Sequence, residues 1–153
     1  MPCLKIVPEP YETYEDTYTL IHRYIYPKSV CIGGLAVDPV NAADHMEFYR
    51  ISWGKTTGAR VRHFVLSYDD MESGKIHSCR ELESIAYEIC DYYKDSYQII
   101  FGIHQFPRWH IHFVMNTLNY RTGRKYRRNK QDDNELREVI YWTIGSAVPV
   151  FYN

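Results

Sequence analysis

The chain has 153 residues, of which 45% are hydrophobic and 16% aromatic, and its formal net charge at pH 7 is −1. This size and composition predict one globular domain, residues 1–153, and exclude a disordered chain, while the near-neutral charge excludes a protein that coats nucleic acid through bulk positive charge. No apolar run approaches the roughly 18 residues of a membrane helix, and the first residues lack the pattern of a signal sequence. We therefore expect a cytoplasmic protein. The four cysteines show no CxxC spacing, which favours free thiols.

The first third of the chain is expected to begin with a strand at Leu4–Val7. A helix is predicted over Tyr14–Tyr26, where apolar residues recur every three or four positions, and Pro27 ends it. The following segment contains Gly33 and Gly34, and we interpret it as a connection.

Two more helices are expected around a central strand. Asn41 can cap a helix that runs through Trp53, and Ser78 with Glu81 has the spacing of a capping box at the start of another. The second of these helices has a clear apolar face, formed by Leu82, Ile85, Ala86 and Ile89. Between the helices, Arg60–Tyr68 partly alternates as a strand does.

The last third predicts a β-hairpin and a final helix. Tyr97–His104 and Trp109–Asn116 are rich in β-branched and aromatic residues and are separated by a short turn, so they should pair. The helix would be capped near Asp132 or Asp133, and its apolar face is formed by Leu136, Val139, Ile140 and Ile144. The elements together predict an α+β fold: an antiparallel β-sheet with helices packed mainly on one face.

Three histidines converge in the predicted hairpin. Side chains alternate along a strand, so His110 and His112 share one face. A register that sets His104 opposite His110 adds a third imidazole to that face and places Gly102 opposite His112, where the glycine would give the imidazoles room. Three histidine ligands leave positions open on a metal ion, which is typical of a catalytic site. His63 on a neighbouring strand is a spare candidate ligand.

A basic run follows the hairpin, with no acidic residue inside it. Its members are Arg121, Arg124, Lys125, Arg127, Arg128 and Lys130. Such a run is usually a solvated loop, but a surface that follows a phosphate backbone needs the same residues.

The segment Ile103–Tyr126 resembles the histidine motif of plasmid relaxases, the mobilisation nucleases of the HUH endonuclease superfamily. Its members have a first histidine, then a His-hydrophobic-His strand, an asparagine four residues later and a Thr-Gly-Lys-like turn. The matching residues here are His104, His110 to His112, Asn116 and Thr122 to Arg124. Upstream, Tyr24–Lys28 resembles the tyrosine motif of the family and Arg62–Tyr68 its intervening strand.

The resemblance implies a metal-dependent enzyme that nicks single-stranded DNA and transfers the strand. The three histidines would hold a divalent ion, Mg²⁺ or Mn²⁺, and Tyr24, with Tyr26 in reserve, would attack the scissile phosphate to leave a phosphotyrosyl enzyme and a free 3′-hydroxyl. Asn116 and the basic run would contact DNA. The partners implied are single-stranded DNA at an origin-like site and accessory mobilisation proteins, in plasmid conjugation.

Three other functions stay open. Tyr141, on the last helix, would serve as the nucleophile of an HUH replication initiator or transposase. The family usually has an acidic residue where this chain has Phe106, which favours a degenerate relaxase-like protein that binds single-stranded DNA without catalysis, stacking bases on Trp109, Phe106 or Tyr120. A nucleotide hydrolase of the histidine-triad type would need a further histidine in place of Val114.

Overall fold

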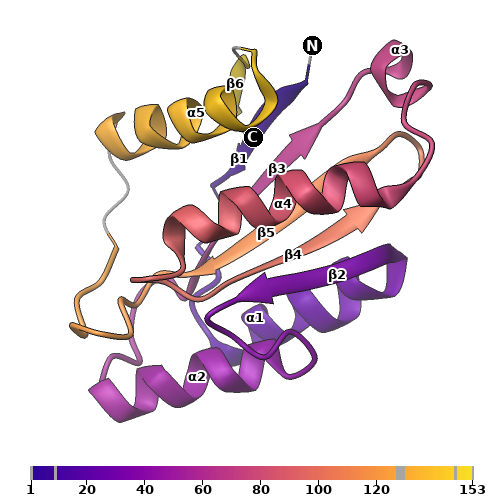
Figure 1. Ribbon diagram of the computed structural model, residues 1–153. Helices are drawn as coiled ribbons and strands as arrows, with labels where there is room; N and C mark the ends of the chain where they lie inside the picture. The colour runs from indigo at the N-terminus through magenta and orange to yellow at the C-terminus, as the bar shows by residue number, and fades with distance from the viewer. Residues whose placement is uncertain (1, 9, 127–129, 147, 153) are drawn as a thin grey trace.

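Figure 1 shows the computed structural model, which describes every residue except 1, 9, 127–129, 147 and 153. The described residues form one six-stranded sheet in the order β2-β4-β5-β3-β1-β6, antiparallel throughout apart from the parallel pair of β1 and β6. The strands are β1 (Cys3–Val7), β2 (Ser29–Leu35), β3 (Val61–Ser67), β4 (Ile99–His104), β5 (His110–Asn116) and β6 (Val150–Tyr152). The predicted α+β fold is confirmed, with two differences from the prediction: the sheet includes one parallel pair, and the helices are not packed mainly on one face.

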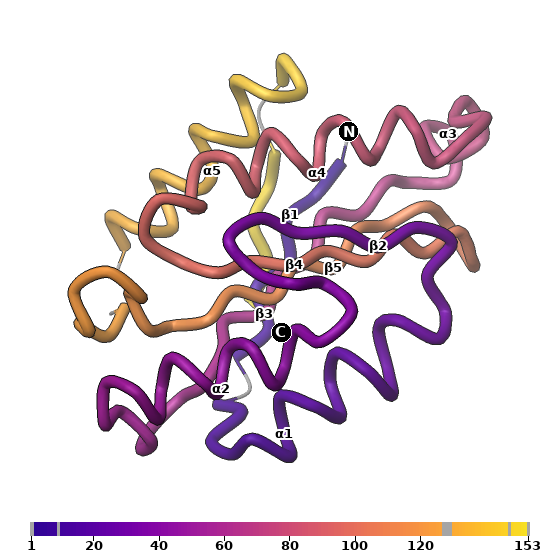
Figure 2. Tube along the Cα trace, turned by 60° about the horizontal axis from the view of Figure 1, so that its bottom comes forward, coloured from indigo at the N-terminus to yellow at the C-terminus, as the bar shows by residue number. Residues whose placement is uncertain are grey.

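Helices cover both faces of this sheet, as the turned view in Figure 2 shows. They are α1 (Tyr14–Tyr18), which continues into the π-helical segment η1 (Thr19–Ile25) and the short 3₁₀ turn η2 (Tyr26–Lys28), then α2 (Ala42–Trp53), α3 (Asp70–Ser73), α4 (Cys79–Tyr93) and α5 (Lys130–Ile144). The pair α4 and α5 lies on one face, and α1 with η1 and α2 lies on the other. Within the described part of the chain, no helix combines the length and apolar character needed to span a bilayer.

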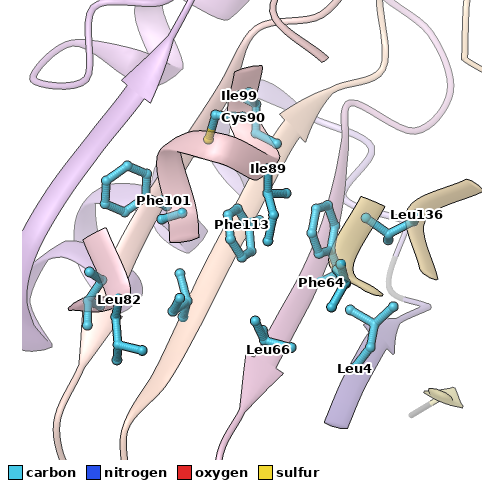
Figure 3. Packing of buried hydrophobic residues seen from close by; sticks show 14 of the residues in the cluster. Leu4, Phe64, Leu66, Leu82, Ile89, Cys90, Ile99, Phe101, Phe113 and Leu136 are labelled. Carbon is cyan, nitrogen blue, oxygen red and sulfur yellow. The ribbon is translucent and has the colours of Figure 1, made fainter. Parts of the chain in front are cut away.

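The larger hydrophobic core lies between the sheet and the pair α4 and α5 (Figure 3). Phe101 and Phe113 meet Leu82 and Ile89 of α4 there, and Leu136 of α5 completes the layer. On the opposite face a smaller core joins residues of η1 and α2 to the sheet; its members include Leu20, Ile21, Ile25, Met46, Ile100 and Val114. The smaller core covers only part of its face.

The N-terminal helix begins at a capping box. The Thr13 hydroxyl accepts a hydrogen bond from the Asp16 backbone N–H at 3.0 Å, and the Asp16 carboxylate accepts one from the Thr13 N–H at 3.1 Å. The predicted helix over Tyr14–Tyr26 is therefore present, but its second half, Thr19–Ile25, is π-helical. Because π-helical turns are frequent at functional sites, the position of Tyr24 within this segment is consistent with a functional role.

The expectation that Gly33 and Gly34 lie in a connection is wrong, because both belong to β2. This edge strand pairs with β4, and the glycines allow close packing. A Cβ atom on Gly33 would lie 2.5 Å from the Tyr87 hydroxyl oxygen and 2.6 Å from the Phe101 ring, and one on Gly34 would lie 2.7 Å from the Ile99 carbonyl oxygen. Here the glycines mark close approach of neighbouring elements.

The predicted helices occur where expected, but their caps differ. Within the described structure, neither the Asn41 nor the Ser78 side chain makes a capping hydrogen bond. The described part of α5 already includes Asp133, so the prediction that this residue caps the helix is wrong. Its buried carboxylate instead accepts hydrogen bonds from Arg62 at 2.6 Å and from the Tyr152 hydroxyl at 2.8 Å. Asp133 therefore ties α5 to β3 and β6.

Candidate metal centre

The β4–β5 hairpin has the predicted register. His104 pairs with His110, and Gly102 pairs with His112. All three imidazoles therefore project from the face that carries α1 and α2, and one ring nitrogen from each lies within 4.8 Å of the others. Their ring centroids are 4.5 to 5.1 Å apart. Three nitrogen atoms at this separation can bind one metal ion.

Backbone carbonyl groups orient two of the three imidazoles. His104 donates from Nε2 to the Ile25 carbonyl oxygen at 2.8 Å, and His110 donates from Nδ1 to the Arg108 carbonyl oxygen at 2.7 Å. In these tautomers the lone pair of each ring is on its other nitrogen, Nδ1 of His104 and Nε2 of His110. Each ring therefore has one nitrogen available as a ligand.

The third imidazole is oriented by another histidine. His112 Nδ1 lies 2.8 Å from His63 Nε2, and His63 Nδ1 lies 3.1 Å from the Tyr11 hydroxyl oxygen. The remaining nitrogen, His112 Nε2, is buried and has no hydrogen-bond partner among the described residues. A buried nitrogen without a partner is costly, and a bound metal ion would satisfy it. The site thus fits a divalent ion.

Burial keeps this cluster in the neutral form that binds metals. It lowers the pKa of His112 to about 2, with a smaller contribution from the adjacent imidazoles, and lowers the pKa of His63 to about 4. Burial also lowers the pKa values of His104 and His110. Because a metal ligand must be the unprotonated imidazole, low pKa values favour binding.

Gly102 allows the end of the N-terminal helix to pack closely against the sheet. We expected this glycine to give the imidazoles room, but a Cβ atom here would lie 2.5 Å from both Ile25 Cγ2 and Ser29 Oγ. The space is therefore occupied by the end of η1, whose Ile25 carbonyl group accepts the hydrogen bond from His104. The same close approach brings the neighbouring Tyr24 to the cluster.

Tyr24 lies beside the histidines in a groove of about 1090 Å³. Its ring centroid is 5.8 Å from that of His112, with the planes nearly perpendicular, and 45% of the residue is exposed. The Lys28 ammonium group lies 5.0 Å from the centre of the tyrosine ring. The groove is also lined by the positively charged Lys5 and Arg108 and by the negatively charged Glu12, Glu15 and Asp16. A phosphate beside Tyr24 would therefore meet a hydroxyl group, the Lys28 ammonium group and the histidine cluster.

The two other tyrosines considered as nucleophiles are placed differently. Tyr26 donates its hydroxyl hydrogen bond to the Pro39 carbonyl oxygen at 2.6 Å and is not among the described residues that line the groove. Tyr141 lies on α5, which covers the face of the sheet opposite the histidines. Tyr24 is thus the tyrosine of the three that adjoins the cluster.

Asn116 cannot contact DNA, and its expected role there is wrong. The residue is fully buried. Its side-chain oxygen accepts a hydrogen bond from Arg50 Nε at 3.1 Å, and its amide group donates to Gln98 Oε1 at 3.1 Å and to the Met46 carbonyl oxygen at 3.3 Å. Asn116 therefore anchors α2 to the end of β5.

The basic run lies away from the metal centre. It follows the last residue of β5, whereas His110 and His112 lie at the start of that strand, which at about 3.3 Å per residue is roughly 20 Å long (Figure 1). Arg121 and Arg124 are exposed, while the Lys125 ammonium group donates to the Thr57 carbonyl oxygen at 2.7 Å. The predicted contacts of Arg127 and Arg128 lie outside the described residues.

The sequence did not reveal the partners of the imidazoles. His63 was considered a spare ligand, but its hydrogen bond to His112 makes it a neighbour of the ligand set. This contact follows from the β3–β5 register, in which Val65 pairs with His112. The sequence does not determine that register, because no turn of fixed length links the two strands. Phe106, at the position where the resemblance implies an acidic residue, is 79% exposed at the tip of the hairpin.

An antiparallel hairpin with a His-hydrophobic-His strand, completed by a third histidine from the paired strand, is the arrangement that the resemblance to relaxases implies. The family model "Relaxase: MobA/VirD2-like, nuclease domain" matches residues 26–141. Because the match covers more than half of the chain, this protein belongs to the relaxase family. Comparison with curated proteins and with solved structures gives no significant match. Tyr24 lies two residues before the matched region, so the family match itself does not bear on the role of this residue.

Acid is expected to destabilise the metal-free protein through its buried histidines. Histidine has a pKa near 6.5 in an unfolded chain, against about 4 for His63 and about 2 for His112 in the folded protein. Below pH 6.5 the unfolded chain therefore binds protons that the folded chain does not. The free energy of unfolding should fall from pH 6.5 towards pH 4, by up to about 1.4 kcal/mol per pH unit for each histidine.

Urea unfolding at pH 7 and pH 5 would measure this loss. The His63→Phe variant, with one buried histidine fewer, should lose less stability over the same interval. Equal losses in the wild type and in this variant would contradict the assignment of the pH effect to His63.

Proposed function

We propose that this protein nicks single-stranded DNA and transfers the cleaved strand, with Tyr24 as the nucleophile and His104, His110 and His112 as metal ligands. The observation that carries the proposal is the position of the half-exposed Tyr24, 5.8 Å from the His112 ring and in the same groove. Membership of the relaxase family supports the reaction class. The setting would be mobilisation of plasmid DNA from an origin-like site, in the cytoplasm and with accessory mobilisation proteins.

The side chains around the groove suit a phosphoryl transfer. A divalent ion held by the three histidines would polarise the scissile phosphate and offset the negative charge that builds on its oxygens. The Tyr24 oxygen forms a bond to phosphorus as the bond from phosphorus to the 3′-oxygen breaks, which leaves a 5′-phosphotyrosyl enzyme and a free 3′-hydroxyl. Lys28 and Arg108 would hold the phosphate backbone near the tyrosine.

The ligand set favours Mn²⁺ over Mg²⁺. All three proposed ligands are imidazole nitrogens, and no carboxylate belongs to the cluster found among the described residues. Imidazole binds transition metals well, whereas Mg²⁺ prefers carboxylate, phosphate and water oxygens.

A covalent adduct would test the proposed function. Purified protein would be incubated with Mn²⁺ and a pool of single-stranded oligonucleotides, then separated under denaturing conditions. A band of protein linked to the 5′-phosphate of cleaved DNA is the expected result. The absence of any adduct with Mn²⁺ or Mg²⁺ would reject the enzyme in favour of a protein that only binds single-stranded DNA. The exposed Phe106, in the turn of the hairpin that carries the histidines, is available for base stacking and supports that second candidate.

The basic run is expected to add affinity for DNA without taking part in the chemistry. Replacing Arg121 and Arg124 with alanine should weaken binding of an oligonucleotide long enough to reach both ends of β5. It should also reduce the slope of log affinity against log salt by about 0.7 for each phosphate that the variant no longer neutralises. Fluorescence anisotropy at several salt concentrations would measure both effects.

An Arg108→Ala variant provides the comparison, because this residue lines the groove beside the histidines. On an oligonucleotide of only four nucleotides, Arg108→Ala should weaken binding and the double variant should not. A double variant with the wild-type salt slope on the long oligonucleotide would exclude the basic run from the DNA interface.

A further inference from the structure

A chain of hydrogen bonds leads from the metal centre to the N-terminal segment. His112 Nδ1, His63 Nε2, His63 Nδ1 and the Tyr11 hydroxyl group follow one another at 2.8 Å between the imidazoles and 3.1 Å to the phenol. For His112 to offer a lone pair at Nε2, its proton must be on Nδ1 and must be donated to His63 Nε2. His63 then carries its own proton on Nδ1 and donates it to the tyrosine oxygen. The chain is therefore consistent with only one direction of donation when a metal is bound.

The structure holds Tyr11 in an unfavourable backbone conformation to make this contact. Its φ angle is +43°, a left-handed value that costs a residue with a side chain of this size free energy. The Tyr11 carbonyl oxygen accepts a hydrogen bond from the Arg60 backbone N–H at 2.8 Å, and Arg60 Nε donates to the Glu12 carbonyl oxygen at 3.1 Å. Arg60 is itself fixed by two hydrogen bonds to the Glu47 carboxylate. Strain maintained in this way at the edge of a site indicates a functional constraint.

Burial and hydrogen bonds hold the His63 ring in one orientation. Only 4% of the residue is exposed, and its ring stacks on that of His112 with the centroids 5.1 Å apart. Both ring nitrogens have partners, so the ring cannot turn over without losing two buried hydrogen bonds. To act as a spare ligand, His63 would have to break these two hydrogen bonds before it could bind a metal ion.

We propose that His63 and Tyr11 are positioning residues of the metal centre, and we call them the His63–Tyr11 pair. His63 accepts the Nδ1 proton of His112, and Tyr11 accepts the Nδ1 proton of His63, so the pair stabilises the tautomer of His112 that has its lone pair on Nε2. In this role the pair stands in place of the carboxylate that commonly orients a metal-binding histidine. A carboxylate would add a negative charge beside the ion, whereas this pair adds none. The bound ion would therefore keep more of its charge for the substrate phosphate. The inference rests on the proposed metal site, but the tautomer of His112 can be measured without a metal.

Long-range ¹H–¹⁵N NMR spectra of the metal-free protein report which nitrogen of His112 carries the proton, and calorimetry with Mn²⁺ reports the affinity of the centre. In the wild type the proton should be on Nδ1. His63→Phe should give a mixture of tautomers and weaken Mn²⁺ binding by about 10- to 100-fold. Tyr11→Phe should have a smaller effect of roughly 2- to 10-fold, as expected for the loss of one neutral hydrogen bond.

Two further variants separate positioning from a general structural effect. In His63→Gln the amide oxygen can occupy the place of Nε2 and accept the same hydrogen bond, so tautomer and affinity should stay close to those of the wild type. Tyr14→Phe removes another tyrosine hydroxyl from the N-terminal region, one that donates to Asp44, and should change neither measurement.

The proposal is overturned if His63→Phe and Tyr11→Phe keep the wild-type tautomer and affinity. It is equally overturned if His63→Gln loses as much affinity as His63→Phe while both variants have the wild-type circular dichroism spectrum. A wild-type protein that binds no Mn²⁺ would instead defeat the proposed function, and the tautomer comparison would still decide the role of the His63–Tyr11 pair.

Discussion

Replacement of Tyr24 by phenylalanine is expected to abolish the covalent protein–DNA adduct and to lower DNA cleavage by on the order of 10⁴-fold or more, because the attacking oxygen is removed. The ring would remain against His112, so the metal centre should be intact. Adduct formation on a cleavable oligonucleotide in Mn²⁺, followed under denaturing conditions, measures the first effect. Calorimetry should give the wild-type affinity for Mn²⁺.

Two matched variants test whether the loss is specific to Tyr24. Tyr26→Phe removes a hydroxyl group that is bonded to the Pro39 carbonyl oxygen, and Tyr141→Phe removes one from the far side of the sheet. Both should retain the adduct. An adduct that persists in Tyr24→Phe and disappears in Tyr141→Phe would replace the relaxase mechanism with that of a replication initiator or transposase.

The histidine cluster could be predicted from sequence because its geometry is local. His104 and His110 are joined by a short turn, and the alternation of side chains along each strand then determines which residues share a face. To bring together three histidines that lie within nine residues of sequence, only one strand register had to be predicted, and that register is confirmed.

The surroundings of the cluster depend on contacts distant in sequence. The approach of Tyr24 depends on the absence of a side chain at Gly102, which is 78 residues away, and the contact of His63 with His112 depends on how β3 pairs with β5. No short turn determines either the approach of η1 to Gly102 or the register of β3 with β5. Family resemblance selected Tyr24, and its 5.8 Å separation from His112 supports that choice on independent grounds.

Local patterns were also misleading where burial decides the role of a residue. Asn116 has the spacing of a family motif but satisfies buried groups of α2 and the Gln98 side chain. Gly33 and Gly34 were interpreted as part of a connection, although they lie in β2 and allow it to pack closely against Tyr87 and β4. In both cases the residue type is explained by a contact with residues distant in sequence, and the local pattern does not reveal that contact.

Replacement of His110 by alanine is expected to weaken Mn²⁺ binding by more than about 100-fold, beyond the range expected for a residue that only orients a ligand. His110 is the most exposed of the three imidazoles, and its side chain donates a hydrogen bond to the nearby Arg108 carbonyl oxygen. The variant should therefore fold normally, which makes it a better test than removal of the buried His112. His77→Ala, at an exposed position outside the cluster, is the matched control.

Thermal and chemical unfolding then give a second measurement that needs no DNA. A ligand that binds only the folded state raises the free energy of unfolding by about 2.7 kcal/mol when its concentration is 100 times the dissociation constant. Wild type and His77→Ala should both show this increase in Mn²⁺, whereas His110→Ala at the same concentration should gain less than about 0.5 kcal/mol, because a 100-fold weaker site is only half occupied. Equal stabilisation of His110→Ala and the wild type would mean that Mn²⁺ binds elsewhere, and the three histidines would then be a packed cluster of neutral side chains without a metal.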